Sequence, residues 1–164
     1  MKLSQTNGPI LHFYDGNERA SFEHLKNAGF KYVDVSFWSR YNAGSRYFTE
    51  SNDKLADEYK RILDKLELIP VQSHEPFGNS MGEDGGAFYF KKTPLSIDLA
   101  GKIGIPSITL HAGLETTPMS RNEYMEKNAE IFKKLIPYAE KYGTKLLYRE
   151  HGLEGGRYSP FRGR

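Results

Sequence analysis

The sequence has no cysteine, no apolar run long enough to cross a membrane, and almost no excess of either sign of charge. Without cysteine there is no disulfide framework and no thiolate metal site, which fits a reducing compartment. The 23 basic and 21 acidic residues give a net charge of +2, which is too small to indicate a polyanion-binding surface. The first residues also lack a signal-peptide pattern. We therefore expect a cytoplasmic protein for which neither a membrane nor nucleic acid is the partner.

Three stretches of the chain follow one pattern: a lysine precedes an apolar, strand-like segment that stops at a polar residue nine positions after the lysine. The lysines are Lys65, Lys102 and Lys141, and the polar endpoints are His74, His111 and Glu150. Successive endpoints lie 37 and 39 residues apart. A spacing in this range indicates a repeated supersecondary unit.

Helix signals separate these segments. Residues 52–67 carry an apolar stripe at helical spacing behind Ser51, which is a plausible cap. The stripe consists of Leu55, Tyr59, Ile62, Leu63 and Leu66. Residues 21–28 predict a shorter helix, and Thr93 with Pro94 predicts the start of another.

A long helix is predicted after Ser120, because Ser120 and Glu123 have the spacing of a capping box. Its expected apolar stripe is Met125, Ala129, Phe132, Ile136 and Ala139. Pro137 lies inside this pattern and should kink the helix or split it in two. Gly143 marks its end.

Strand-like segments alternate with these helices at residues 11–15, 31–37, 69–74, 107–111 and 145–150. Such alternation predicts parallel strands joined by right-handed helical crossovers. The turn after the first strand has neither a GxGxxG pattern nor a phosphate loop, which favours a barrel over a doubly wound sheet. Because the carboxyl ends of parallel strands share one rim, His74, His111 and Glu150 should converge there. His12, on the first strand beside Tyr14, is interpreted as a packed or solvated histidine.

The loop FWSRYNAGSRYF follows the second strand and offers further binding groups. Trp38 is a candidate for stacking on a sugar, and Arg40 or Arg46 for binding a phosphate. An aromatic loop packed on the mouth of a barrel is an equally good interpretation of the same residues. Asp34 lies on the second strand. An acidic side chain near the end of a strand often only caps the next turn.

Four segments carry a resemblance to a known family: FEHLKNAGFKYVDVSF, ILDKLELIPVQSHEPFG, AGKIGIPSITLHAG and AEKYGTKLLYRE. Over residues 10–150 they resemble the first to fifth strand units of the xylose isomerase-like TIM barrel. This superfamily contains sugar phosphate isomerases and epimerases, inosose dehydratases and endonuclease IV. The resemblance implies an α/β fold of parallel (β/α) units, in which this chain supplies the first five strands of an incomplete barrel.

The resemblance also implies roles for individual residues. His74 and His111 match the histidines of the third and fourth strands, which would hydrogen-bond the substrate or, in the nuclease branch, bind zinc. Asp34 matches an acidic position of the second strand and is a further candidate for substrate binding. Glu150 matches the fifth-strand carboxylate that binds a divalent metal, which would be Mg, Mn or Zn. The implied substrate is a small sugar or sugar phosphate. The implied reaction is isomerisation or epimerisation by proton transfer next to a carbonyl.

The end of the sequence departs from the family pattern. Only fourteen residues follow Glu150, whereas a complete barrel takes ~250 and the family's other metal ligands lie on strands six to eight. We therefore expect a partial barrel over residues 1–150 and a disordered, non-family tail over residues 151–164. If Glu150 faces the site, alternation sends Arg149 into the apolar helix layer. A frameshift or premature end shortly after Leu147 would explain both features.

These observations leave three hypotheses. The chain is the amino-terminal half of a metal-dependent sugar isomerase or epimerase, inactive or self-associating as written. Alternatively, it is a fragment of an endonuclease IV-like DNA repair enzyme, against which the small net charge argues. The third possibility is a non-catalytic half barrel that forms a homo-oligomer through its open sheet edges.

Overall fold

The computed structural model describes residues 3–38, 40–41, 44–114 and 117–149. Its strands are β1 (Ser4–Thr6), β2 (Tyr32–Ser36), β3 (Ile69–His74), β4 (Ser107–His111) and β5 (Lys145–Arg149). They form one sheet in the order β1-β2-β3-β4-β5, and every neighbouring pair is parallel. The helices are α1 (Gly8–Phe13), α2 (Glu18–Asn27), α3 (Arg46–Thr49), α4 (Asn52–Lys65), α5 (Ala87–Ile103) and α6 (Arg121–Glu140). The predicted α/β fold of parallel units, the first half of a TIM barrel, is confirmed.

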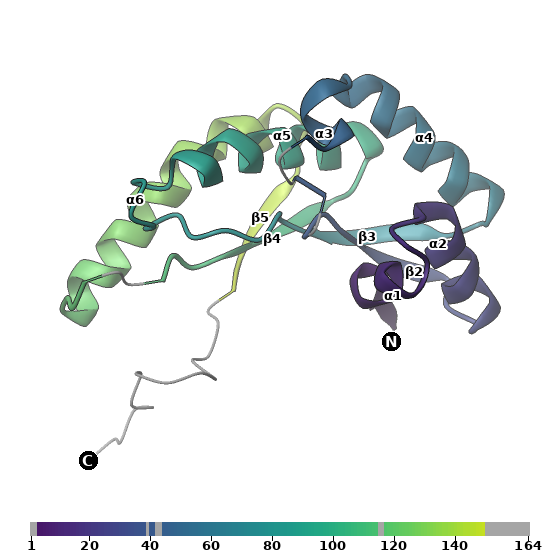
Figure 1. Cartoon of the computed structure of the whole chain (residues 1–164), viewed down its shortest axis with the longest axis horizontal. Helices are drawn as coiled ribbons and strands as arrows, with labels where there is room; N and C mark the ends of the chain where they lie inside the picture. Colours follow the sequence, from purple (N-terminus) through teal and green to yellow (C-terminus); the bar gives the residue numbers. More distant parts are fainter. Residues whose placement is uncertain (1–2, 39, 42–43, 115–116, 150–164) are drawn as a thin grey trace, which may run out of the picture.

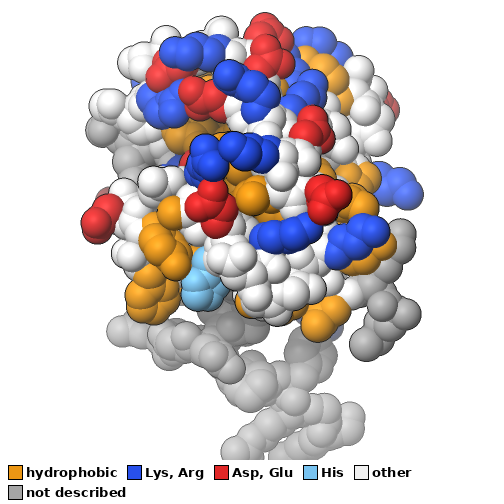
Figure 2. Space-filling view, turned by 90° about the vertical axis from the view of Figure 1, so that its right-hand side faces the viewer, with side chains coloured by type: hydrophobic (Ala, Val, Ile, Leu, Met, Phe, Trp, Pro, Cys, Tyr) orange, Lys and Arg blue, Asp and Glu red, His pale blue; other side chains and the backbone are white. Residues whose placement is uncertain are grey.

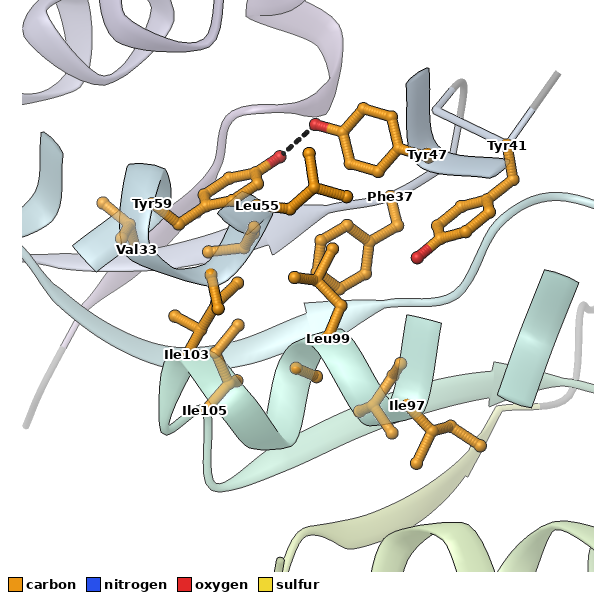
Figure 3. Close-up of a cluster of buried hydrophobic side chains, with 14 of the residues drawn as sticks. Val33, Phe37, Tyr41, Tyr47, Leu55, Tyr59, Ile97, Leu99, Ile103 and Ile105 are labelled. Atoms are coloured by element: carbon orange, nitrogen blue, oxygen red, sulfur yellow. Dashed lines mark hydrogen bonds between the residues drawn. The ribbon is translucent and has the colours of Figure 1, made fainter. Parts of the chain in front are cut away.

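Helices α4, α5 and α6 cover one face of the sheet (Figure 1). That face is apolar because alternate residues of the central strands point into it. Val33 and Val35 of β2 and Ile108 and Leu110 of β4 are completely buried there. Figure 3 shows the neighbouring part of the core, where aromatic and aliphatic side chains from the β2 region, α4 and α5 meet. None of the described helices has the length and apolar character needed to cross a membrane.

The predicted first strand is wrong. Residues 11–15 were expected to be extended, but β1 lies earlier, at Ser4–Thr6, and His12 belongs to helix α1. Pro9 stands in the first turn of α1, where its fixed φ favours a helix and its missing N–H costs nothing. Gly8 permits the tight passage from strand to helix, because a Cβ there would lie 2.8 Å from Ser36 Oγ. The short polar strand has no alternating apolar pattern to reveal it.

Helix α5 begins six residues earlier than Thr93, so Pro94 lies inside it. The earlier start follows from Asp84, whose carboxylate accepts the backbone N–H groups of Gly86 at 2.9 Å and Phe88 at 3.0 Å. These bonds satisfy amides that have no partner within the helix. The proline predicted to start this helix therefore lies in its interior.

Helix α6 has the predicted capping box and end and is not split at Pro137, but its buried stripe differs from the predicted one. Ser120 and Glu123 bond each other's backbone N–H groups. Pro137 sits in the last turn of one continuous helix, where little remains for it to disrupt. The buried residues are Tyr124, Asn128, Ile131, Leu135 and Ala139. Met125 and Ile136 are 46% and 42% exposed, because the stripe is rotated to bury Asn128, which accepts the N–H of Gly113 at 2.8 Å.

Helix α4 forms as predicted behind the Ser51 cap and buries Leu55, Tyr59 and Leu63. It packs against α2, β3 and α5. Strands β1 and β5 form the two edges of the described sheet. The proposed tail at residues 151–164 and Glu150 lie outside the described residues.

Candidate functional site

The face of the sheet opposite the core carries polar side chains at its carboxyl edge. Asp34 alternates with the buried Val33 and Val35 on β2. Thr109 and His111 alternate in the same way with the apolar residues of β4, and Thr109 is the register partner of His74. The predicted convergence of strand ends therefore places acidic, imidazole and hydroxyl groups side by side.

Asp34 and His74 are in direct contact. Nδ1 of His74 lies 3.0 Å from Oδ1 and 2.9 Å from Oδ2 of Asp34. Gln72 donates from Nε2 to Oδ2 of Asp34 at 2.9 Å, which holds the carboxylate in place. With Nδ1–H donated to the carboxylate, a neutral His74 carries its acceptor lone pair on Nε2. The arrangement is that of an oriented imidazole able to take up a proton.

His111 lies beside this pair. The rings of His74 and His111 stack with their centroids 5.9 Å apart and an interplanar angle of 24°. The two histidines singled out from equal offsets in the sequence, together with Asp34, thus form one cluster. Stacked imidazoles at a strand edge can bind neighbouring oxygen atoms of one polyhydroxylated ligand.

An aromatic pair flanks the cluster. Trp38 follows β2 and Phe77 follows β3, and their rings meet edge to face with centroids 5.9 Å apart. The N–H of Phe77 donates to the carbonyl of Trp38 at 3.2 Å, so the two loops are joined. Trp38 is 51% exposed and Phe77 56% exposed. The sequence reasoning found Trp38 but missed Phe77, whose only signal was its position three residues after His74.

Arg40 is engaged elsewhere. Its Nε lies 2.7 Å from Oε1 of Glu18, a carboxylate that also accepts the hydroxyls of Tyr47 and Tyr59 at 2.7 and 2.6 Å. Burial raises the pKa of Glu18, and the Arg40 charge and the tyrosine hydrogen bonds act in the opposite direction. Arg46, the other candidate, pairs with Glu50 and Glu58. Phosphate binding by Arg40 stays a prediction.

Arg149 lies on the face opposite to the one expected for it. It is the register partner of His111, and its carbonyl accepts the N–H of Ala112 at 3.2 Å. Tyr148 instead faces the helix layer, where its ring meets Phe132 of α6 at a centroid distance of 5.1 Å. The expected orientation was wrong; it had been deduced by alternation from Glu150, which lies outside the described residues.

Glu75 is a buried carboxyl group that the sequence reasoning overlooked. It is 1% exposed, and burial raises its pKa to about 8. Hydrogen bonds from the backbone of His111 and the side chain of Tyr89, and the charge of Lys92, act in the opposite direction. Its signal in the sequence was its place directly after the strand-ending His74.

The family model described as the xylose isomerase-like TIM barrel matches residues 22–160. The chain belongs to this family. Among curated proteins, none matches the sequence. The family assignment agrees with the resemblance inferred from the strand endings.

Several solved structures share the fold. A 3-keto-D-glucoside 4-epimerase from E. coli has a TM-score of 0.66 at 16% identity, covering 90% of this chain and 55% of that one. The IolI protein with a bound zinc atom has a TM-score of 0.63 at 19% identity, covering 93% and 52%. An AP endonuclease, family 2, from Brucella melitensis has a TM-score of 0.62 at 16% identity, covering 90% and 54%. The chain spans about half the length of these proteins.

The described part of this xylose isomerase-like chain does not by itself make a metal centre. Within residues 3–38, 40–41, 44–114 and 117–149, no three His, Cys, Asp or Glu side chains come together in a way that could hold an ion. Asp34 and His74, the best oxygen and nitrogen donors at the rim, bond each other. The predicted ligand Glu150 lies outside these ranges.

Proposed function

We propose that this chain supplies the substrate-binding half of a sugar isomerase or epimerase that moves a proton at the carbon next to a carbonyl. The contact between Asp34 and His74 beside His111 carries the proposal. Asp34 orients the imidazole and stabilises the imidazolium, while Nε2 of His74 accepts the proton. His111 hydrogen-bonds an oxygen of the substrate. The epimerase among the similar structures supports this assignment at the level of the fold.

The substrate we propose is a small sugar or sugar phosphate. The exposed rings of Trp38 and Phe77 suit the apolar C–H face of a sugar. Arg149 lies at the same rim, and no acidic side chain of the described residues pairs with it. A guanidinium in that position can bind a phosphate group through bidentate hydrogen bonds. Arg149 thus takes the role that the sequence suggested for Arg40.

A divalent metal, Mg, Mn or Zn, belongs to the proposal only for a complete family site with Glu150 as a ligand. The zinc in IolI shows that a relative of the same fold holds such an ion. The described donor set does not fit a metal centre on its own. The proton transfer proposed here therefore uses only Asp34 and His74.

Sugar binding and proton exchange test the proposal separately. D-fructose and D-fructose 6-phosphate should perturb the ring carbon NMR signals of His74 and His111. Arg149→Gln should weaken the binding of D-fructose 6-phosphate and leave the binding of D-fructose unchanged. In D₂O, loss of the C–H signals next to the carbonyl reports proton transfer, which His74→Gln should slow by roughly 10²- to 10⁴-fold. His24→Gln is the matched control, because His24 contacts Tyr14 on the surface of α2. Absence of binding by both sugars would remove the proposal.

If the sugars bind without exchange, the chain is a binding half that needs further residues for turnover. A non-catalytic half barrel then remains, with β1 and β5 as open edges of the described sheet. Self-association through these edges predicts a sedimentation coefficient that rises with concentration. A strictly monomeric chain at all concentrations would contradict it.

The endonuclease alternative has less support. Basic and acidic side chains are interspersed on the face shown in Figure 2. Ion pairs such as Arg19 with Glu23 and Arg46 with Glu58 also bring the two signs of charge together. Such a surface lacks the one-signed charge that duplex DNA requires. A gel shift with abasic DNA at low salt, showing no complex, is the expected result.

A further inference from the structure

Glu75 connects the two strands that carry the histidines. It follows His74 directly, and its own N–H donates to the carbonyl of Thr109 on β4 at 3.0 Å. Its Oε1 accepts the backbone N–H of His111 at 2.6 Å. Its Oε2 accepts the hydroxyl of Tyr89, on α5, at 2.7 Å. One buried side chain therefore joins β3, β4 and a helix.

The position of these bonds in the sheet gives them a particular importance. The β3–β4 register contains only the pairs Ser73 with Ile108 and His74 with Thr109. The pairing of β4 with β5 continues further, to His111. Beyond Thr109, β3 no longer supplies a backbone acceptor, so the N–H of His111 bonds the Glu75 side chain instead. The carboxylate extends the ladder between β3 and β4 where the strands separate.

Helix α5 holds this carboxylate from the other side. Tyr89 is buried and donates to it, and Lys92, also buried, lies close enough to act on its charge. Nζ of Lys92 bonds the carbonyl of Phe77 in the same loop. A Cβ at Gly78 would lie 2.9 Å from Cε and Nζ of Lys92, so the lysine side chain would have to move. The groups around Glu75 leave it little freedom to move.

We propose that Glu75 is a positioning residue that fixes the backbone of His111 and so keeps its ring stacked on His74. The proposal rests on the function proposed above, because it gives the stacked histidines their purpose. Glu75 need not touch the substrate. Burying a carboxyl group away from water is costly, and its retention at this point is accounted for by the bonds it makes to both strands.

The backbone amide of His111 gives a direct test on the full chain without any sugar. An ionised carboxylate makes a shorter, stronger bond than a neutral carboxyl, so the amide proton of His111 should move downfield as Glu75 loses its proton. The titratable groups facing Glu75 are Tyr89, Lys92, His111 and the adjacent His74. The ring carbon signals of the two histidines record imidazole protonation separately. We expect an amide transition with a midpoint of about 8, the pKa to which burial raises Glu75.

Three variants separate positioning from a general loss of structure. Glu75→Gln keeps an acceptor and should keep the ring contact between His74 and His111, seen as a nuclear Overhauser effect, but abolish the amide transition. Glu75→Ala should lose both. Glu23→Gln, a change of an exposed carboxylate on α2, should alter neither.

Two results would overturn the proposal. One is an unchanged amide transition in Glu75→Gln, which would assign the titration to another group. The other is a folded Glu75→Ala chain with the wild-type amide position and ring contact. The amide transition and the ring contact are both measured without sugar. A failure of sugar binding therefore does not affect this test of Glu75. If proton exchange occurs, Glu75→Ala should slow it by ~100-fold, and Glu75→Gln should restore most of it.

Discussion

The two faces of the sheet have different tasks, although they are made by alternate residues of the same strands. Toward the helices, Val33, Val35, Ile108 and Leu110 are completely buried in apolar surroundings. On the other face the same strands carry carboxylate, imidazole and hydroxyl groups at the carboxyl edge. A shift of one residue along a strand therefore separates a position in the apolar core from one that faces the candidate site. Substitutions on the two faces should have separable effects.

The largest effect on stability is expected at the centre of the helix-facing side. Ile108→Ala should lower the free energy of unfolding by ~2–5 kcal/mol, because it leaves a cavity among residues that cannot collapse around it. Thr109→Ser, the matched change on the adjacent residue, removes one methyl group and should cost ~0.8 kcal/mol. Urea unfolding measures both, with an unchanged slope as the condition for comparison. Equal losses would show that the two faces share the stabilisation.

The alternation also explains what the sequence predicted and where it failed. The spacing of apolar residues and the polar strand endings sufficed to predict strands β2 to β5 and the proximity of His74 and His111. A buried parallel sheet requires apolar strands and places their carboxyl ends along one edge. These sequence features could not predict the hydrogen bonds of Glu75, whose partner His111 is 36 residues away and is contacted through its backbone. Arg149 was expected on the other face because the phase of the strand was taken from Glu150, whereas the register with β4 pairs Arg149 with His111.

A smaller effect is expected from the polar cluster on the helix-facing side. Tyr59→Phe keeps the buried ring but removes the hydroxyl that bonds Glu18 at 2.6 Å and Tyr47 at 2.9 Å, the latter drawn in Figure 3. We expect a loss of ~1–3 kcal/mol, because a buried carboxyl group loses a partner. Tyr138→Phe, at an exposed position of α6, should change the stability by less than ~0.5 kcal/mol. A similar cost for both would mean that the buried hydroxyl contributes nothing specific.

The pH dependence of stability should reveal Glu75, the buried carboxyl group between β3, β4 and α5. Its pKa in the folded chain, about 8, exceeds the ordinary glutamate value of 4.5. Between these values the folded chain binds more protons than the unfolded chain, so stability falls as pH rises and levels off above about 8. The slope from one such group is at most ~1.4 kcal/mol per pH unit.

Glu75→Gln should flatten that fall. Glu18, whose pKa is also raised by burial, contributes in the same direction and should account for the slope that remains. Urea unfolding of both chains across this pH range provides the measurement. Parallel curves for the wild type and the variant would show that Glu75 ionises at its ordinary value in the folded chain.

The smallest effect on stability is expected at Ser120, the exposed N-cap of helix α6 on the helix-facing side of the sheet. Ser120→Ala removes the hydroxyl that accepts the N–H of Glu123 at 3.3 Å and breaks the capping box of α6. We expect a loss of ~1 kcal/mol, well below that of Ile108→Ala. Ser120→Asp keeps an acceptor at the cap and should restore most of the loss in urea unfolding. A loss as large as that of Ile108→Ala would show that membership of the helix layer, rather than burial against the sheet, determines how much a residue stabilises the fold.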